Sequence, residues 1–148
     1  MSKLIFPAAP APTLAIAGSD DRIPVQRVFC VGRNYEEHAK EMGQQVERDE
    51  PFYFTKSPEA VVADGSTIPY APATSNYHYE FELAVVIGAP AFRVSKQDAL
   101  SKVYGYACAL DMTRRDLQLA KRAKQLPWDI GKDIEFSAPI SAVVPAAK

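Results

Sequence analysis

The chain has 148 residues and a formal net charge of −1, from 17 Lys and Arg against 18 Asp and Glu. Apolar residues make up 47% and charged residues 24%, which is typical of a globular protein and excludes a disordered or fibrous one. Charge near neutrality disfavours a nucleic-acid partner, and no apolar run approaches transmembrane length. The two cysteines, Cys30 and Cys108, lie in apolar runs. They indicate buried thiols in a reducing compartment, and so a cytoplasmic protein.

The first half of the chain predicts short strands separated by irregular segments. We expect residues 1–24 to form an extended arm or a first strand, because Pro7, Pro10 and Pro12 interrupt the apolar stretch at residues 1–18; an export signal is the less favoured alternative. Residues 25–31 predict a short buried strand, and residues 34–42 predict a helix that Asn34 caps and Gly43 ends. A strand at 51–57 and an irregular stretch at 63–76 are predicted after this helix.

Residues 77–88 give the strongest strand prediction. The odd positions from Tyr77 to Ile87 are all apolar, whereas Glu80 and Glu82 occupy even positions. Since side chains alternate along a strand, both glutamates share one face, and we expect the apolar face to meet the core. The remaining elements are a short helix at 95–103 capped by Ser95, a buried strand at 104–111, a helix at 113–124 opened by a Thr-x-x-Asp pattern, and weak alternation at 130–144.

Glu80, Glu82 and Asp111 form the first candidate site. Asp111 lies where a buried strand passes into a helix, so it can join the two glutamates. Three carboxylates without a cysteine suit Mg²⁺ or Mn²⁺ better than zinc. On spacing alone the alternative is favoured, in which the glutamates face solvent and Asp111 satisfies the following helix.

His38 and Glu41 form the second candidate site, since positions i and i+3 are neighbours on a helix. A carboxylate beside an imidazole favours a general base that activates water, although a solvated helix face explains the same spacing. Arg115 and Gln118 lie at the start of the helix predicted from residue 113, where an anion can bind, and solvated Arg–Asp pairs are the alternative. Lys132 follows a glycine on a predicted strand and could stabilise an oxyanion, or lie at the surface.

Together these segments resemble the fumarylacetoacetate hydrolase family. The most specific are Val-Gly-Arg-Asn-Tyr at 31–35 and Asp-Met-Thr-Arg-Arg-Asp-Leu-Gln at 111–118. Within the family, the likeness is greatest to bacterial acylpyruvate hydrolases. The resemblance implies an α+β fold that is mostly β, a mixed β-roll with a few short helices. Residues 25–148 would be the N-terminal portion of one catalytic domain, incomplete at the C-terminus because family members continue past Lys148 with further strands.

The resemblance also implies an activity and a role for each candidate residue. The expected reaction is metal-dependent hydrolysis of a carbon–carbon bond in a β-diketo acid, above all of fumarylpyruvate to fumarate and pyruvate in aromatic-compound (gentisate) breakdown. A homodimer that binds a small-molecule acid, without nucleic acid or membrane, is implied as well. The implied roles are metal ligands for Glu80, Glu82 and Asp111, catalysis for His38, Glu41 and Lys132, and substrate binding for Arg115, Gln118, Tyr35 and Lys56.

Two alternatives stay open. Related enzymes decarboxylate or isomerise 2-oxo acids such as oxaloacetate and homoprotocatechuate-pathway acids, and they use the same enolate chemistry. A non-catalytic truncated paralogue would keep the fold without the reaction.

Overall fold

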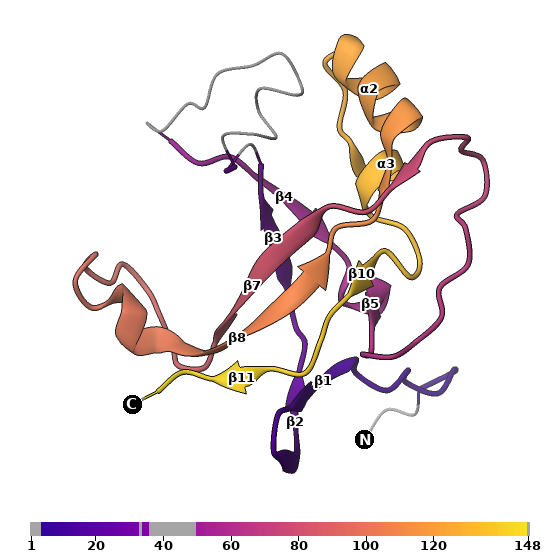
Figure 1. Ribbon diagram of the computed structural model, residues 1–148. Coiled ribbons are helices and arrows are strands. Elements are labelled where there is room, and N and C mark those ends of the chain that lie inside the picture. Colours follow the sequence, from indigo (N-terminus) through magenta and orange to yellow (C-terminus); the bar gives the residue numbers. More distant parts are fainter. Residues whose placement is uncertain (1–3, 33, 36–49, 148) are drawn as a thin grey trace.

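The computed structural model describes residues 4–32, 34–35 and 50–147, and it is mostly β-structure (Figure 1). The helices in these ranges are α2 (Arg115–Ala123) and α3 (Asp129–Lys132), with 3₁₀ turns η1 (Pro58–Ala60) and η2 (Ala99–Lys102). The strands are β1 (Thr13–Ile16), β2 (Ser19–Pro24), β3 (Val28–Val31), β4 (Tyr53–Lys56), β5 (Val61–Val62), β6 (Tyr77–His78), β7 (Phe81–Ile87), β8 (Val103–Leu110), β9 (Thr113–Arg114), β10 (Ala138–Pro139) and β11 (Val144–Pro145).

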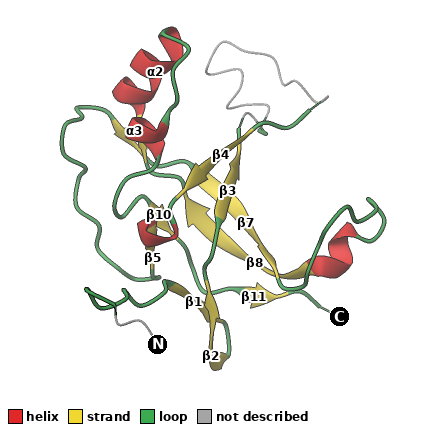
Figure 2. Ribbon diagram, turned by 180° about the vertical axis from the view of Figure 1, so that it is seen from behind, coloured by secondary structure: helices red, strands yellow, loops and turns green. Residues whose placement is uncertain are grey.

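The longest strands, β7 and β8, form an antiparallel pair that organises the molecule. They belong to a three-stranded sheet in the order β11-β8-β7, and Glu82 lies opposite Ala109 in their register. The other described strands pair two by two, as β1-β2, β3-β4, β6-β9 and β5-β10. Both ribbon views place α2 and α3 together near the end of β7 where that strand begins (Figures 1 and 2). The β1-β2 hairpin lies at the opposite end.

The core lies on the glutamate-bearing face of β7, which contradicts the predicted orientation of that strand. Ala84 and Val86 share a face with Glu82, and they pack against a buried cluster of Leu14, Ala107, Ile140 and Val143. Alternation shows which side chains share a face, but it does not show which face meets the core.

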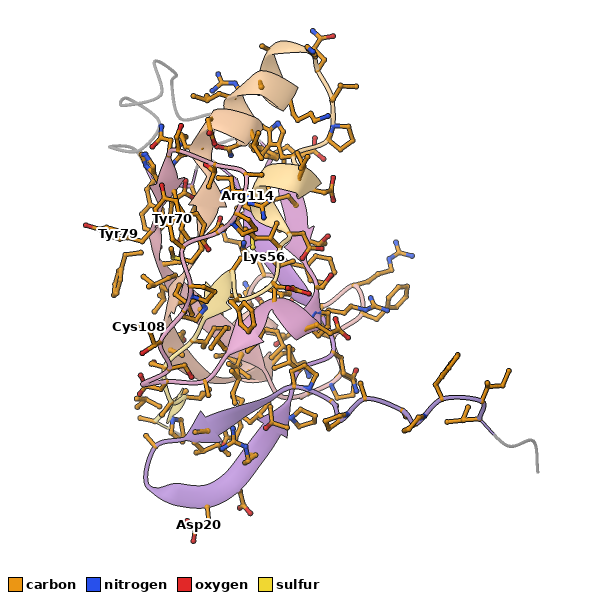
Figure 3. All side chains as sticks on the ribbon, turned by 90° about the vertical axis from the view of Figure 1, so that its right-hand side faces the viewer. Asp20, Lys56, Tyr70, Tyr79, Cys108 and Arg114 are labelled. Carbon is orange, nitrogen blue, oxygen red and sulfur yellow. The ribbon has the colours of Figure 1, made fainter. Side chains whose placement is uncertain are left out.

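The other face of the β7-β8 pair is apolar and exposed. The side chains of Phe81, Leu83, Val85 and Ile87 on β7 are between 49% and 68% exposed. Cys108, opposite Leu83, is also exposed, so the prediction of two buried thiols is wrong for this residue. Figure 3 shows Tyr79, just before β7, pointing away from the body of the molecule.

Several predicted elements are confirmed. The strands predicted at 51–57 and 104–111 appear as β4 and β8, and residues 63–76 contain no helix or strand. Near residue 95, the Ser95 hydroxyl accepts a hydrogen bond from Asp98 N at 3.1 Å, as predicted, but the turn that follows is 3₁₀ rather than α-helical. From residue 36 onward, the predicted helix at 34–42 lies outside the described residues.

Three predicted boundaries are wrong around the candidate site. The strand predicted at 77–88 is divided into two strands, because β6 pairs with β9 whereas β7 pairs with β8. Helix α2 begins at Arg115, since Thr113 and Arg114 form β9. Lys132 ends helix α3 and does not lie on a strand. Within the residues that the structure describes, no helix combines the length and apolar character that a membrane crossing requires.

Candidate functional site

Glu80 and Asp111 face each other across two neighbouring backbone segments. Glu80 N donates to Asp111 O at 3.3 Å, and Asp111 N donates to Glu80 O at 2.8 Å. Residues that exchange both backbone hydrogen bonds in an antiparallel pair project their side chains to the same side. Glu82 follows two residues after Glu80, so its side chain projects to that side as well. The backbone therefore places all three predicted carboxylates on one face.

The Lys132 ammonium lies between the first two carboxylates. Its Nζ is 2.7 Å from Glu80 Oε2 and 2.6 Å from Asp111 Oδ2, and it donates to Thr113 Oγ1 at 2.7 Å. Arg115 Nη2 donates to the remaining oxygen of the Glu80 carboxylate. The Lys132 side chain is only 3% exposed, which excludes the surface-lysine alternative. Charge-assisted contacts at this burial hold the side chains in one arrangement.

Lys56 lies behind Asp111. Its Nζ is 2.9 Å from Asp111 Oδ1, and it donates to Met112 O at 3.2 Å, to Ser137 Oγ at 3.0 Å and to the carbonyl oxygen of Lys132. The Lys56 side chain is 1% exposed. This residue therefore lies inside the protein (Figure 3), and the substrate-binding role that the resemblance implies for it stays a prediction.

Arg115 and Gln118 lie on the inner face of α2. They are 6% and 5% exposed, and Arg115 Nη1 donates to Gln118 Oε1 at 2.5 Å. The alternative of solvated Arg–Asp pairs is therefore wrong for these two residues. Arg115 uses two of its five N–H groups on Gln118 and Glu80, so it orients the Glu80 carboxylate besides any contact that it makes with a ligand.

The pKa values within this cluster move in opposite directions. Burial opposes ionisation of Glu80, but Lys132 and Arg115 outweigh burial and hold the pKa of Glu80 below its ordinary value. Burial, together with the negative charges of Asp111 and Glu80, raises the pKa of Glu82 to about 6. Glu82 is thus the carboxylate whose negative charge is least compensated, and it would gain most from an added cation.

Close packing between the two helices carries Lys132 to this position. A Cβ added at Gly131 would lie 2.9 Å from Gln118 N, so only glycine lets α3 approach α2 this closely. On the other side, the Lys132 Nζ lies 5.0 Å from the centre of the Phe54 ring on β4. Sequence reasoning singled out Lys132 but not the small residue that gives it room.

Tyr35 lies beside Glu82, and its predicted role in substrate binding stays a prediction. Leu83 N donates to the Tyr35 hydroxyl at 3.4 Å, and that hydroxyl also hydrogen-bonds to the Glu82 carboxylate. The predicted catalytic pair His38 and Glu41 lies outside the described residues, so its role stays a prediction.

The side chains do not form a ready metal cluster. Among residues 4–32, 34–35 and 50–147, no group of three or more His, Cys, Asp or Glu side chains is arranged to hold a metal ion. Glu80 and Asp111 meet on Lys132, and Glu82 is not part of that contact. The predicted site of three carboxylates around one ion is therefore not confirmed.

The donor atoms nevertheless fit a hard cation. Asp111 Oδ1 is buried, and the Lys56 ammonium that pairs with it at 2.9 Å leaves one of its two lone pairs for another partner. A buried carboxylate oxygen with an unused lone pair is a suitable ligand for Mg²⁺ or Mn²⁺. Glu82, with its raised pKa, supplies the same kind of oxygen on the same face.

Sequence reasoning missed two members of the cluster. Thr113, which the pattern predicted as a helix cap, is 0% exposed, donates to Asp111 O at 3.0 Å and accepts a hydrogen bond from Lys132. Ser137, also 0% exposed, accepts a hydrogen bond from Lys56. Nothing in the sequence near Ser137 distinguishes it from a loop serine.

Comparisons with known proteins find similar sequences along most of the chain. The family model described as "Fumarylacetoacetate (FAA) hydrolase C-terminal" matches residues 27–148. A fumarylpyruvate hydrolase from Ralstonia sp is 56% identical over 106 residues, which cover 70% of this chain and 55% of that protein. A mitochondrial oxaloacetate tautomerase from Arabidopsis thaliana is 43% identical over 121 residues, 82% of this chain and 54% of that protein.

A solved structure extends the likeness to the fold. The crystal structure of fumarylpyruvate hydrolase from Pseudomonas aeruginosa, in complex with Mn²⁺ and pyruvate, matches with a TM-score of 0.91 at 48% identity. The match covers 97% of this chain and 64% of that one. The chain thus spans little more than half the length of these curated relatives. The mostly β fold with short helices, the family model and the identities together show that the chain belongs to the fumarylacetoacetate hydrolase family.

Proposed function

We propose that this chain carries the site of an acylpyruvate hydrolase, with fumarylpyruvate as substrate and fumarate and pyruvate as products. The observation that carries the proposal is the buried cluster of Glu80, Asp111, Lys132 and Arg115. It lies in a chain that is 56% identical, where the two match, to a fumarylpyruvate hydrolase. A cluster of this kind is costly to bury, and a purely structural core does not require it.

We propose Glu80, Glu82 and Asp111 as the residues that hold a divalent cation, Mg²⁺ or Mn²⁺. The neighbour from Pseudomonas aeruginosa contains Mn²⁺ and pyruvate, which supports Mn²⁺ as the ion to test first. When bound, such an ion acts as a Lewis acid toward the keto oxygen and the carboxylate of a 2-oxo acid.

The residues of the chain then have distinct tasks. Lys132 keeps a fixed positive charge beside the carboxylates, where it stabilises negative charge that develops on the substrate oxygen. Arg115 and Gln118 orient Glu80 and provide further N–H donors for the acidic end of the substrate. Tyr35 holds its own segment of the chain beside Glu82 through a hydrogen bond to the Glu82 carboxylate.

His38 is the proposed base that takes a proton from the attacking water, with Glu41 as its partner. Support comes from the described residue Tyr35, which lies three positions before His38 in the sequence and hydrogen-bonds to Leu83 N and to the Glu82 carboxylate. Water adds its hydroxyl to the distal acyl carbon, the carbon–carbon bond breaks toward pyruvate, and the pyruvate carbon takes a proton. A homodimer and a cytoplasmic location stay predictions.

Oxaloacetate tautomerisation is the second candidate. Several oxaloacetate tautomerases are 39–43% identical to this chain over 82–83% of its length, a broader but weaker likeness than that to the Ralstonia enzyme. Both reactions pass through the enol form of a 2-oxo acid, so the described residues serve either one.

A panel of three substrates distinguishes these functions. We expect the full chain with Mn²⁺ to release pyruvate from fumarylpyruvate faster than from acetylpyruvate, as measured by coupled reduction of pyruvate with lactate dehydrogenase. His38→Ala should abolish this release and leave Mn²⁺ binding intact. Interconversion of oxaloacetate tautomers without cleavage of fumarylpyruvate would favour the second candidate, and inertness toward all three would contradict both.

A further inference from the structure

We infer that Lys56 is a positioning residue, which holds Asp111 and the backbone of Lys132 in register for the metal site and does not touch the substrate. This role rests on the proposed function, since it concerns the carboxylate that would bind the ion. It differs from the substrate-binding role that the resemblance implied.

The surroundings of the Lys56 ammonium leave no room for a ligand. Its polar contacts go to the carbonyl oxygens of Met112 and Lys132, to the Ser137 hydroxyl and to Asp111 Oδ1. These acceptors use the three N–H donors that an ammonium carries. With a side chain that is 1% exposed, Lys56 reaches no solvent through which a substrate could approach.

The same contacts join chain segments that are distant in the sequence. Met112 follows Asp111, and Lys132 is the residue whose ammonium bridges Asp111 and Glu80. Lys56 therefore holds both partners of the Lys132–Asp111 ion pair, one through the adjacent carbonyl group and the other through its own carbonyl group.

Ser57 reinforces this connection one residue further along both segments. Ser57 N donates to Asp133 Oδ1 at 2.7 Å, and the Ser57 hydroxyl donates to Asp133 Oδ2 at 2.8 Å. The consecutive residues Lys56 and Ser57, at the end of β4, thus bind the consecutive residues Lys132 and Asp133, at the end of α3. Two adjacent attachments fix the direction of the segment as well as its position.

Lys56 also leaves Asp111 able to bind a cation. Its Nζ pairs with Asp111 Oδ1 at 2.9 Å, and a carboxylate oxygen has a second lone pair besides the one that faces the ammonium. The position of Asp111 is therefore fixed while one of its oxygens stays available as a ligand.

The direction in which cation affinity changes on replacement of Lys56 distinguishes a positioning role from a purely electrostatic one. Removal of a positive charge 2.9 Å from a metal-binding carboxylate should tighten cation binding if electrostatics alone matters. If Lys56 positions Asp111, the same removal should weaken binding, because the ligand loses its fixed orientation. Residues that orient metal ligands typically change affinity about 10- to 100-fold when they are replaced.

The test is a titration of the full chain with Mn²⁺, in which electron paramagnetic resonance measures the concentration of the free ion. We expect Lys56→Met to weaken Mn²⁺ binding by about 10-fold or more. Lys96→Met, which removes an exposed lysine, should leave binding unchanged. At saturating Mn²⁺, Lys56→Met should lower kcat for fumarylpyruvate and leave KM unchanged.

Ser137→Ala is a second variant, which tests the same role if Lys56→Met does not fold. It removes one acceptor of Lys56 without changing any charge, and it should weaken Mn²⁺ binding in the same direction. Should Lys56→Met fail to fold, Ser137→Ala decides. The inference would be overturned if the deciding variant bound Mn²⁺ as tightly as the wild type or more tightly. A raised KM with unchanged kcat in that variant would overturn it as well. A wild-type chain that binds no Mn²⁺ would overturn the proposed metal site and this role with it.

Discussion

Lys132 Nζ lies 2.6 Å from Asp111 Oδ2, although the two residues come from different elements, the end of α3 and the turn after β8. The same ammonium lies 2.7 Å from Glu80 Oε2. One cation therefore joins two carboxylates that the backbone already holds opposite each other. The candidate site is built around this contact.

Replacement of Lys132 should destabilise the protein as well as inactivate it. Lys132→Met leaves two buried carboxylates short of a counter-charge, and loss of one partner from a buried ion pair costs about 3–5 kcal/mol. We expect the lower end, because Arg115 and Lys56 stay beside Glu80 and Asp111. Urea unfolding measures the difference, with the exposed Lys124→Met as control. Equal stability of the two variants would show that the cluster contributes little.

Gly131→Ala should disturb the site through the backbone. The added methyl group would lie 2.9 Å from Gln118 N, so α3 must move away from α2. We expect a loss of about 1–3 kcal/mol in unfolding free energy, together with lower turnover, because Lys132 shifts with α3. Ala123→Ser, at an exposed position on α2, is the control. Unchanged turnover in Gly131→Ala would mean that the position of α3 is not critical.

The contact between Thr74 and Asp116 should make part of the stability depend on pH. The Thr74 hydroxyl donates to Asp116 at 2.5 Å, and this bond holds the pKa of Asp116 below its ordinary value. The stabilisation is present above the unfolded-state pKa, and it is lost as the pH falls through the lower, folded-state pKa. Thr74→Val should therefore be less stable than wild type at pH 7, and the gap should close in acid. A gap of equal size at both pH values would contradict this assignment, with the exposed Thr55→Val as control.

The two cysteines should differ in reactivity. Burial raises the pKa of Cys30 to about 11, whereas Cys108 is exposed on the outer face of β8. Because the thiolate is the reactive form, iodoacetamide at pH 8 should modify Cys108 first and Cys30 only after unfolding. Mass spectrometry of partly modified protein measures the order. Equal rates in the folded protein would contradict the partial burial of Cys30.

The sequence predicted some of the residues that gather, but it missed Thr113 and Ser137. The i, i+2 spacing of Glu80 and Glu82 placed both on one face, and the predicted residues Asp111, Arg115 and Gln118 come from one short segment. These are local relationships, so the alternation of a strand and the turn of a helix are sufficient to predict them.

The errors concern contacts between distant segments. Nothing near Lys56 in the sequence shows that residues 76 positions away will cover its ammonium. The apolar series from Phe81 to Ile87 predicted a core-facing side, yet the opposite side, with Ala84 and Val86, packs against the buried cluster. The polarity pattern of a segment does not show which distant segments of the chain will pack against it.

The central claim is that Glu80, Glu82 and Asp111 together bind one divalent cation, and calorimetric titration of the full chain with Mn²⁺ tests it most directly. We expect one ion per chain in the wild type, and a large loss of affinity in each of Glu80→Gln, Glu82→Gln and Asp111→Asn. Glu59→Gln, at an exposed position, should bind as the wild type does. If the wild type binds no ion, or if Glu82→Gln binds Mn²⁺ as tightly as the wild type, these three carboxylates do not form the metal site.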